Sequence, residues 1–353
     1  MPSIEATLTV ELSLFYHAAH RLAGWEVKVN DIISNADVYH QRNNKGRYSM
    51  ADYKIIDAHV HTYPSKEIGL QAKQGSDITN YSGTIDELLS VMKRAAIHKA
   101  VMVSMLPVTE MRDAAITALP KDISQSDSEK ALKEIDARIV GRIERKNAWA
   151  CSVGKEHSNL IPFITVDPVM GEQSIAAEIR DKVKNQGAKG IKLHPASQSQ
   201  FPNHHSLWPI YQTAMELGIP IVFHSGRSEG SAIEYAEPRY FAEVLESFPK
   251  LTLVLAHLGN NFFDQSTALA GKYRNVQFDC CAIVNYSVNE GGLSDPDFTA
   301  LIKNIGTERV MFGSDYPWLD PGVGIKRIMN LNLTEQEKRQ LLGENAIRIY
   351  HLS

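Results

Sequence analysis

The chain has 353 residues, of which 43% are apolar and 22% are charged, a composition typical of a globular protein with one large core or two modest ones. Its formal net charge of −4 and pI near 6.4 provide no basic field, which disfavours a nucleic-acid partner. No apolar run approaches the roughly 18 residues that span a bilayer, so no membrane partner is expected. The three cysteines, Cys151, Cys280 and Cys281, cannot form a disulfide framework and indicate a reducing, cytoplasmic location.

Residues 1–52 differ from the rest of the chain. They contain one amphipathic candidate over 13–24 and then the polar run HQRNNKGRYSMADY at 40–53, which is typical of a linker. We expect 1–52 to be an N-terminal extension or linker and 53–353 to form one domain. Because Met50 stands just ahead of the first predicted strand, we expect it to be the native start.

Beyond residue 53, short runs rich in Val and Ile alternate with amphipathic segments, the pattern of βα units around a parallel sheet. The predicted strands lie at 55–60, 99–106, 160–166, 188–194, 219–224, 251–257, 275–281 and 308–315. Eight such units predict an α/β fold, a (β/α)8 TIM barrel with a short N-terminal extension. A doubly wound open sheet is the rival fold, but the chain lacks a GxGxxG turn after its first strand.

Helical patterns fill the spaces between these strands. The segment 128–146 places Ile135, Ile139 and Ile143 on one apolar stripe. The last segment, TEQEKRQLLGENAIRIY, predicts a closing helix that begins with a capping box formed by Thr334 and Glu337.

Residues able to bind a metal or move a proton stand where the predicted strands end. They are His59 and His61 at the first strand, His194, His224 and His257 at the fourth to sixth, and Asp315 at the eighth. In a (β/α)8 barrel these ends open on one rim, where the active site lies. Imidazoles with one carboxylate suit one divalent metal ion, Zn²⁺ first and Mn²⁺ or Fe²⁺ next. Such a metal activates water near neutral pH, and Asp315 is the natural group to take its proton.

The motifs IIDAHVH, GIKLHP, IPIVFHSG, LVLAHLGN and VMFGSDYPW follow one another in this order. This series resembles the amidohydrolase superfamily, in particular the amidohydrolase-related branch that includes aminocarboxymuconate semialdehyde decarboxylase and several lactonases. The resemblance covers 53–350. It implies that the metal ligands are His59, His61, His224 and Asp315, and that His257 lies beside the open position to polarise a carbonyl or move a proton.

The chain departs from the binuclear members of that superfamily, in which a carboxylated lysine at the end of strand 4 bridges two metals. Here Lys192 stands two residues before His194, and the strand period turns both side chains inward. Lys192 either bridges metals, if carboxylated, or pairs with Asp57 on the first strand. We expect one metal ion, with His194 at the rim in contact with substrate or water.

Three further residues are candidates for the substrate pocket. Arg227 offers a bidentate fork for a carboxylate, although a loop salt bridge explains it equally well. Tyr63 and Trp318 follow candidate ligands and suit an apolar pocket wall, or ordinary loop packing.

From these features we expect a metal-dependent hydrolase that acts on a small carboxylate, lactone, ester or amide through a metal-activated water. Asp315 would act as general base and then acid, and His257 would stabilise the oxyanion. The first alternative is a nonoxidative decarboxylase (carboxy-lyase) on the same scaffold. A non-catalytic ligand-binding barrel is the second, disfavoured because every ligand position is filled. The expected partner is a small-molecule substrate, and the resemblance also implies a homodimer.

Overall fold

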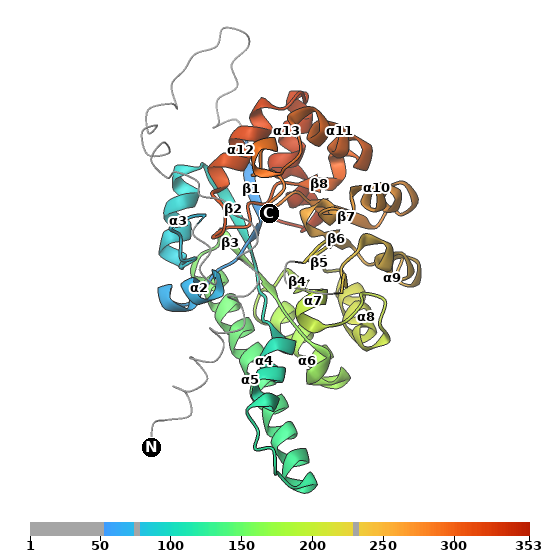
Figure 1. The fold of residues 1–353 in the computed structure, drawn as a ribbon. Helices are drawn as coiled ribbons and strands as arrows, with labels where there is room; N and C mark the ends of the chain where they lie inside the picture. Colours follow the sequence, from blue (N-terminus) through green and yellow to red (C-terminus); the bar gives the residue numbers. More distant parts are fainter. Residues whose placement is uncertain (1–52, 74–77, 229–232) are drawn as a thin grey trace. The chain divides into compact units, whose positions relative to one another are not determined.

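Eight parallel strands pair in chain order from β1 to β8 in one sheet (Figure 1). The computed structural model describes residues 53–73, 78–228 and 233–353, so the predicted extension over 1–52, with Met50, lies outside the described residues. The strands are β1 (Ile55–Val60), β2 (Ile97–Val103), β3 (Leu160–Ile164), β4 (Gly190–Leu193), β5 (Ile221–Phe223), β6 (Leu253–Leu255), β7 (Val276–Asp279) and β8 (Val310–Met311). The predicted (β/α)8 barrel is therefore confirmed.

Backbone contacts between the β1 and β8 segments bring the two edges of the sheet together. The amide of Ala58 donates to the carbonyl of Phe312 at 2.9 Å, and the amide of Asp315 donates to the carbonyl of His59 at 3.0 Å. One residue pair further on, the His61 amide donates to Tyr316 at 2.7 Å. These bonds continue past the end of β8 and set the loop that carries Asp315 against the end of β1.

All eight strands occur where the sequence predicts them, but most end earlier at their carboxyl side. The reason is visible at two site residues, because His257 and Asp315 have φ angles of +59° and +65°. Such left-handed backbone is incompatible with a strand and turns the chain sharply. These side chains therefore stand on turns beyond the strands, not within them.

The floor of the barrel is closed by the end of the chain. Apolar side chains that include Ile56, Val101 and Phe163 form a buried cluster with residues of the last helix. In this cluster the Tyr350 ring packs edge-on against Phe163, with 4.9 Å between the ring centroids. The core fills this end of the barrel, which leaves the carboxyl ends of the strands as the end that carries polar side chains.

Helices follow the strands around the barrel (Figure 1). They are α2 (Lys66–Lys73), α3 (Ile85–Arg94), α4 (Val108–Thr117), α5 (Gln125–Glu156), α6 (Glu172–Lys184), α7 (Pro195–Gln198), α8 (Trp208–Leu217), α9 (Ala242–Ser247), α10 (Phe263–Lys272), α11 (Asp295–Ile305), α12 (Pro321–Asn330), α13 (Glu335–Arg339) and α14 (Asn345–Ile349). The charged side chains of α5 extend along its whole length, and within the described ranges no helix is both long and apolar enough to cross a membrane.

The connection between β2 and β3 is longer than the sequence predicts. The helix predicted over 128–146 extends over 125–156 as α5. It begins at 125 because Ser124 caps it by accepting a hydrogen bond from the Asp127 amide. The sequence patterns did not reveal α4, which packs beside α5 through an ion pair of 2.7 Å between Arg112 and Asp136. Figure 1 shows the amino-terminal half of α5 projecting away from the barrel.

The closing helix is interrupted. Its predicted capping box between Thr334 and Glu337 is confirmed, but α13 and α14 are separated by a wider π-helical turn over Gln340–Glu344. Gly343 lies in this turn against β1, where an added Cβ would stand 1.8 Å from the Lys54 carbonyl oxygen. The glycine lets the last helical segment pack directly on the first strand.

Candidate metal centre

Three of the predicted metal ligands meet at the junction of β1 with the loop after β8. Nε2 of His61 lies 3.4 Å from Oδ1 of Asp315, and Nε2 of His59 lies 3.9 Å from the same oxygen. His59 is fully buried, whereas the Asp315 side chain is 19% exposed. The carboxylate therefore stands between two imidazoles at the open end of the barrel.

The carboxyl group of Asp315 stays ionised in this surrounding. Burial acts to raise its pKa, but the hydrogen bond from His61 and the nearby His257 and His59 lower the pKa overall, well below the usual range. An anionic carboxylate beside imidazole nitrogens is a donor set that a divalent cation binds.

A second carboxylate fixes the orientation of His59. Oδ2 of Asp279, at the end of β7, lies 2.9 Å from Nδ1 of His59, while its Oδ1 accepts from the backbone amides of His257 and Cys281, each at 3.2 Å. Burial alone would raise the pKa of Asp279, but His59 outweighs it and the pKa is lowered. Because an ionised carboxylate only accepts, Nδ1 of His59 carries the proton and Nε2 presents a lone pair toward Asp315.

His224 is oriented by a chain of hydrogen bonds that begins at a backbone carbonyl. Nδ1 of His257 lies 3.2 Å from the carbonyl oxygen of Cys281, which can only accept, so this nitrogen carries a proton. Nε2 of His257 lies 3.0 Å from Nδ1 of His224 and accepts from it when the His257 ring carries that single proton. In this form Nε2 is the unprotonated nitrogen of His224.

Nε2 of His224 is a candidate metal ligand. In the described part of the chain, Nε2 of His224 is buried and has no hydrogen-bond partner. A buried lone pair without a donor is unfavourable unless a ligand satisfies it. Nε2 of His224, Nε2 of His59 and the Asp315 carboxylate are the types of donor that a divalent metal ion binds.

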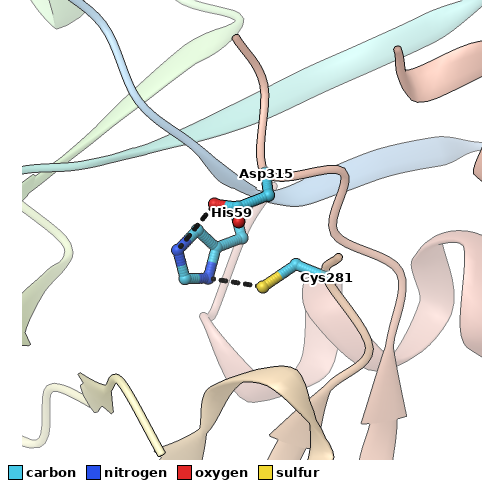
Figure 2. Close-up of side chains that lie close together, drawn as sticks. All are labelled: His59, Cys281 and Asp315. Atoms are coloured by element: carbon cyan, nitrogen blue, oxygen red, sulfur yellow. Dashed lines mark hydrogen bonds and ion pairs between the residues drawn. The ribbon is translucent and has the colours of Figure 1, made fainter. Parts of the chain in front are cut away.

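Cys281 approaches the same centre from the other side of His59. Its Sγ lies 3.3 Å from Nδ1 of His59 and 3.1 Å from Nδ1 of His257. His59, Cys281 and Asp315 are close enough together to be considered as metal ligands. Figure 2 shows, however, that the His59 ring stands between the thiol and the carboxylate, with one ring nitrogen toward each. The thiol contacts Nδ1 of His59, the nitrogen that Asp279 already binds. Cys281 therefore packs on the side of the His59 ring that faces away from Asp315.

Lys192 faces the histidines and does not pair with Asp57. Its buried Nζ lies 3.4 Å from Nε2 of His59, and burial lowers its pKa. Asp57 instead accepts the backbone amides of Ser314 at 2.9 Å and His59 at 3.2 Å through Oδ1. The alternative that pairs Lys192 with Asp57 is therefore not formed.

His194 lies at the rim as expected, with its ring stacked on His224 at 4.1 Å between centroids. Its Nδ1 accepts from the Ser197 amide at 3.2 Å and caps α7. Burial, then the charge of Lys192, lowers the pKa of His194 to about 3, so the ring is neutral. His194 is thus a neutral wall of the site that also starts the next helix.

The substrate-pocket candidates differ in their surroundings. The Trp318 ring stands edge-on to His61, with 5.2 Å between centroids, and Tyr63 is buried two residues beyond His61. Arg227 is 64% exposed, and its Nε lies 3.7 Å from Oε1 of Glu234. The structure brings the two aromatic residues beside the site and pairs the arginine with a loop carboxylate.

Asp279 is the main site residue that the sequence reasoning missed. It stands in the predicted strand NVQFDCC as a single acid within an apolar run, like Asp57 in the first strand. An acid buried at a strand end signals a fixed hydrogen-bonding role, because burying it unpaired is costly. This signal was available, but its partner was not, since His59 is 220 residues away in the chain.

The fold and this rim define the class of (β/α)8 barrels with a histidine and carboxylate centre. The chain belongs to the amidohydrolase family, whose model matches residues 56–352. It is 24% identical over 219 residues to 2-amino-3-carboxymuconate-6-semialdehyde decarboxylase of Dictyostelium discoideum, a match over 52% of this chain and 59% of that protein.

Solved structures share the barrel at low sequence identity. A 5-carboxyvanillate decarboxylase of Novosphingobium aromaticivorans, solved with manganese and 4-hydroxy-3-methoxy-5-nitrobenzoic acid, has a TM-score of 0.61 at 15% identity, over 85% of this chain and 96% of that one. A 2,6-dihydroxybenzoate decarboxylase from Rhizobium has a TM-score of 0.60 at 12% identity, over 85% and 99%. At these identities the likeness shows the fold.

These comparisons overturn the main functional prediction. The similar proteins of known activity are decarboxylases, not hydrolases, and match the alternative reaction. The hydrolase prediction was wrong because the ligand set supports both reactions, and only contacts to the substrate separate them. The preference for zinc is likewise unsupported, since the similar 5-carboxyvanillate decarboxylase was solved with manganese.

Proposed function

We propose that the protein is a divalent-metal-dependent nonoxidative decarboxylase of a small aromatic or dienoic acid. The observation that carries the proposal is the ionised Asp315 carboxylate beside Nε2 of His59 and of His61, together with the buried Nε2 of His224, which has no hydrogen-bond partner in the described part of the chain. The activities of similar proteins supply the reaction, because those of known function remove a carboxyl group as CO₂.

The proposed metal ligands are His59, His61, His224 and Asp315. These residues would hold a divalent cation, which would supply Lewis-acid stabilisation of negative charge on the substrate. Manganese is the first candidate, because a neighbour of the same fold contains it. Asp279 and His257 would keep two of these ligands in the unprotonated form that binding requires.

In the reaction, the bond between the substrate carbon and its carboxylate breaks, CO₂ leaves, and the electron pair stays on that carbon, which then takes one proton. We assign the transfer of this proton to Asp315, which stands at the open end of the site. Its ionised carboxylate first takes a proton from the solvent, passes it to the carbon and is ionised again. His257 supports it through His224 and is the next group able to pass on a proton.

Lys192, His194, Tyr63 and Trp318 are proposed to line the substrate position. Arg227 is proposed to face the substrate only if its pair with Glu234 opens. The small-molecule partner, the homodimer and the cytoplasmic location remain predictions from the sequence.

The test is incubation of manganese-loaded protein with 5-carboxyvanillate, 2,6-dihydroxybenzoate and a panel of lactones, with CO₂ and residual acid measured. We expect CO₂ from at least one acid, none after chelation, and restored release when manganese is added back. In D315N, CO₂ release should fall by about 10²- to 10⁴-fold. Hydrolysis of a lactone without CO₂ from any acid would overturn the proposal.

A further inference from the structure

Glu87, in the first turn of α3, is an acidic residue near the rim that the mechanism above does not use. Its Oε2 accepts from the backbone amides of Ser82 at 2.7 Å and Gly83 at 2.8 Å, and from the hydroxyl of Tyr316 at 2.7 Å. Tyr316 is fully buried and follows Asp315 directly in the chain. One carboxylate oxygen therefore joins the segment before α3 to the loop that carries Asp315.

The segment that Glu87 binds is also bonded to the loop after β1. The carbonyl of Gly83 accepts from the Tyr63 amide at 2.9 Å, and Tyr63 follows the candidate ligand His61 by two residues. The His61 amide in turn donates to the carbonyl of Tyr316 at 2.7 Å. These bonds close a ring that runs from Glu87 through Gly83 and the loop after β1 to Tyr316, and from there back to Glu87.

Gly83 packs tightly between the two loops. Its φ is +78°, and an added Cβ would stand 2.8 Å from Cδ2 of Tyr63 and 3.0 Å from Cγ of Pro317. Inside the ring of hydrogen bonds, Nε2 of His61 lies 3.4 Å from Oδ1 of Asp315. Because a cation requires its donors within a narrow range of distances, a shift of one loop against the other weakens its binding.

We propose that Glu87 is a positioning residue of the metal centre, which fixes the separation of His61 and Asp315 through Gly83 and Tyr316. This inference rests on the metal-dependent function proposed above. Replacing Glu87 leaves every candidate ligand in the chain, so the loss appears as a weaker affinity for the cation. Metal affinity then depends on a carboxylate outside the ligand set.

The test is the affinity for manganese, measured by competition with a chromophoric chelator. E87Q keeps the size of the side chain, but its amide group has one acceptor oxygen in place of two, and its NH₂ cannot accept from the donors of the ring. We expect manganese to bind about 10- to 100-fold more weakly. Y316F removes one bond of the ring and should also weaken binding. In E87Q/Y316F the loss of binding free energy should be smaller than the sum of the two single losses, because both variants break the same hydrogen bond.

Two further variants separate positioning from effects of charge and stability. D86N removes the same charge at exposed Asp86, in the same turn of α3, and should bind manganese like the natural protein. N147A breaks two bonds to the backbone of Thr165 after β3, so it loses stability at another place and should keep its manganese affinity. At saturating manganese, E87Q should regain CO₂ release, since its ligands and substrate contacts remain.

Unchanged manganese affinity in folded E87Q would overturn the proposal, as would an equal loss in D86N or N147A. Circular dichroism shows whether E87Q is folded. If it is not, Y316F decides the question, because it removes only a hydroxyl: a loss of affinity supports the proposal and natural affinity overturns it.

The outcomes also separate this inference from the decarboxylase proposal. If E87Q and Y316F bind manganese weakly but the natural protein releases CO₂ from no acid, the reaction is wrong and the role of Glu87 stands. If the natural protein releases CO₂ and both variants bind manganese as it does, the role of Glu87 alone is wrong.

Discussion

Nδ1 of His224 lies 3.0 Å from Nε2 of His257, and this contact joins two histidines that follow the neighbouring strands β5 and β6. The backbone carbonyl of Cys281 accepts from Nδ1 of His257, so a His257 ring with one proton accepts from Nδ1 of His224 through its Nε2. As a result, Nε2 on the opposite side of the His224 ring has no hydrogen-bond partner among the described residues. In the proposed metal centre, His257 and Cys281 thus orient the candidate ligand His224.

Replacing His257 should weaken metal binding. H257N suits the left-handed backbone at this position, but its short side chain no longer accepts from His224. We expect manganese affinity to fall about 10- to 100-fold in a competition titration. H351N is the control, since exposed His351 has a similar φ of +52°. Unchanged affinity with lost CO₂ release would instead assign His257 to proton transfer.

Asp279 should act on the metal through His59. D279N keeps the shape of the side chain but removes the charge that holds the proton on Nδ1 of His59. Manganese affinity should fall by about 10- to 100-fold, with a smaller change in KM for the acid. D122N, at an exposed aspartate between α4 and α5, should behave like the natural protein. A loss of activity at unchanged metal affinity would contradict this role.

The metal-free protein should lose stability as the pH falls below about 6.5. Burial lowers the pKa of His59 to about 4 and of His194 to about 3, so the unfolded chain binds protons that the folded chain does not. Asp57 opposes this, because burial raises its pKa to about 7 and the folded state then holds its proton. The buried histidines outnumber it, so acid favours unfolding over this window.

Urea unfolding at about pH 7.5 and about pH 5 measures this dependence, and H194Q should reduce the difference by about 1–2 kcal/mol. H205Q, at an exposed histidine, is the control. A midpoint that rises on acidification would show that Asp57 dominates.

Asn147 should contribute to the free energy of unfolding. N147A leaves the amide and carbonyl of Thr165 without their partner in a buried position, which should cost about 2–4 kcal/mol of unfolding free energy. N185A removes only an exposed contact to Asp181 and should have little effect. Urea unfolding measures this loss, and an unchanged free energy of unfolding in N147A would show that α5 is held by its other contacts.

Much of the scaffold could be predicted from the sequence because it depends on local patterns. Alternating apolar strands and amphipathic helices specified eight βα units, and the topology of a barrel then required that the strand ends share one rim. The same reasoning placed His59, His61 and Asp315 together, as the structure does. It failed for α4, whose apolar pattern is weak, and for the reaction, because the ligand types are compatible with hydrolysis and decarboxylation alike.

The sequence by itself determined the order of the elements and the residue types at the strand ends, since both follow from periodicity and from chain connectivity. Only the tertiary structure decided which acid binds Nδ1 of His59 and that His257 contacts His224. These features depend on contacts of about 3 Å between residues distant in the chain, and a one-dimensional pattern contains no such distances.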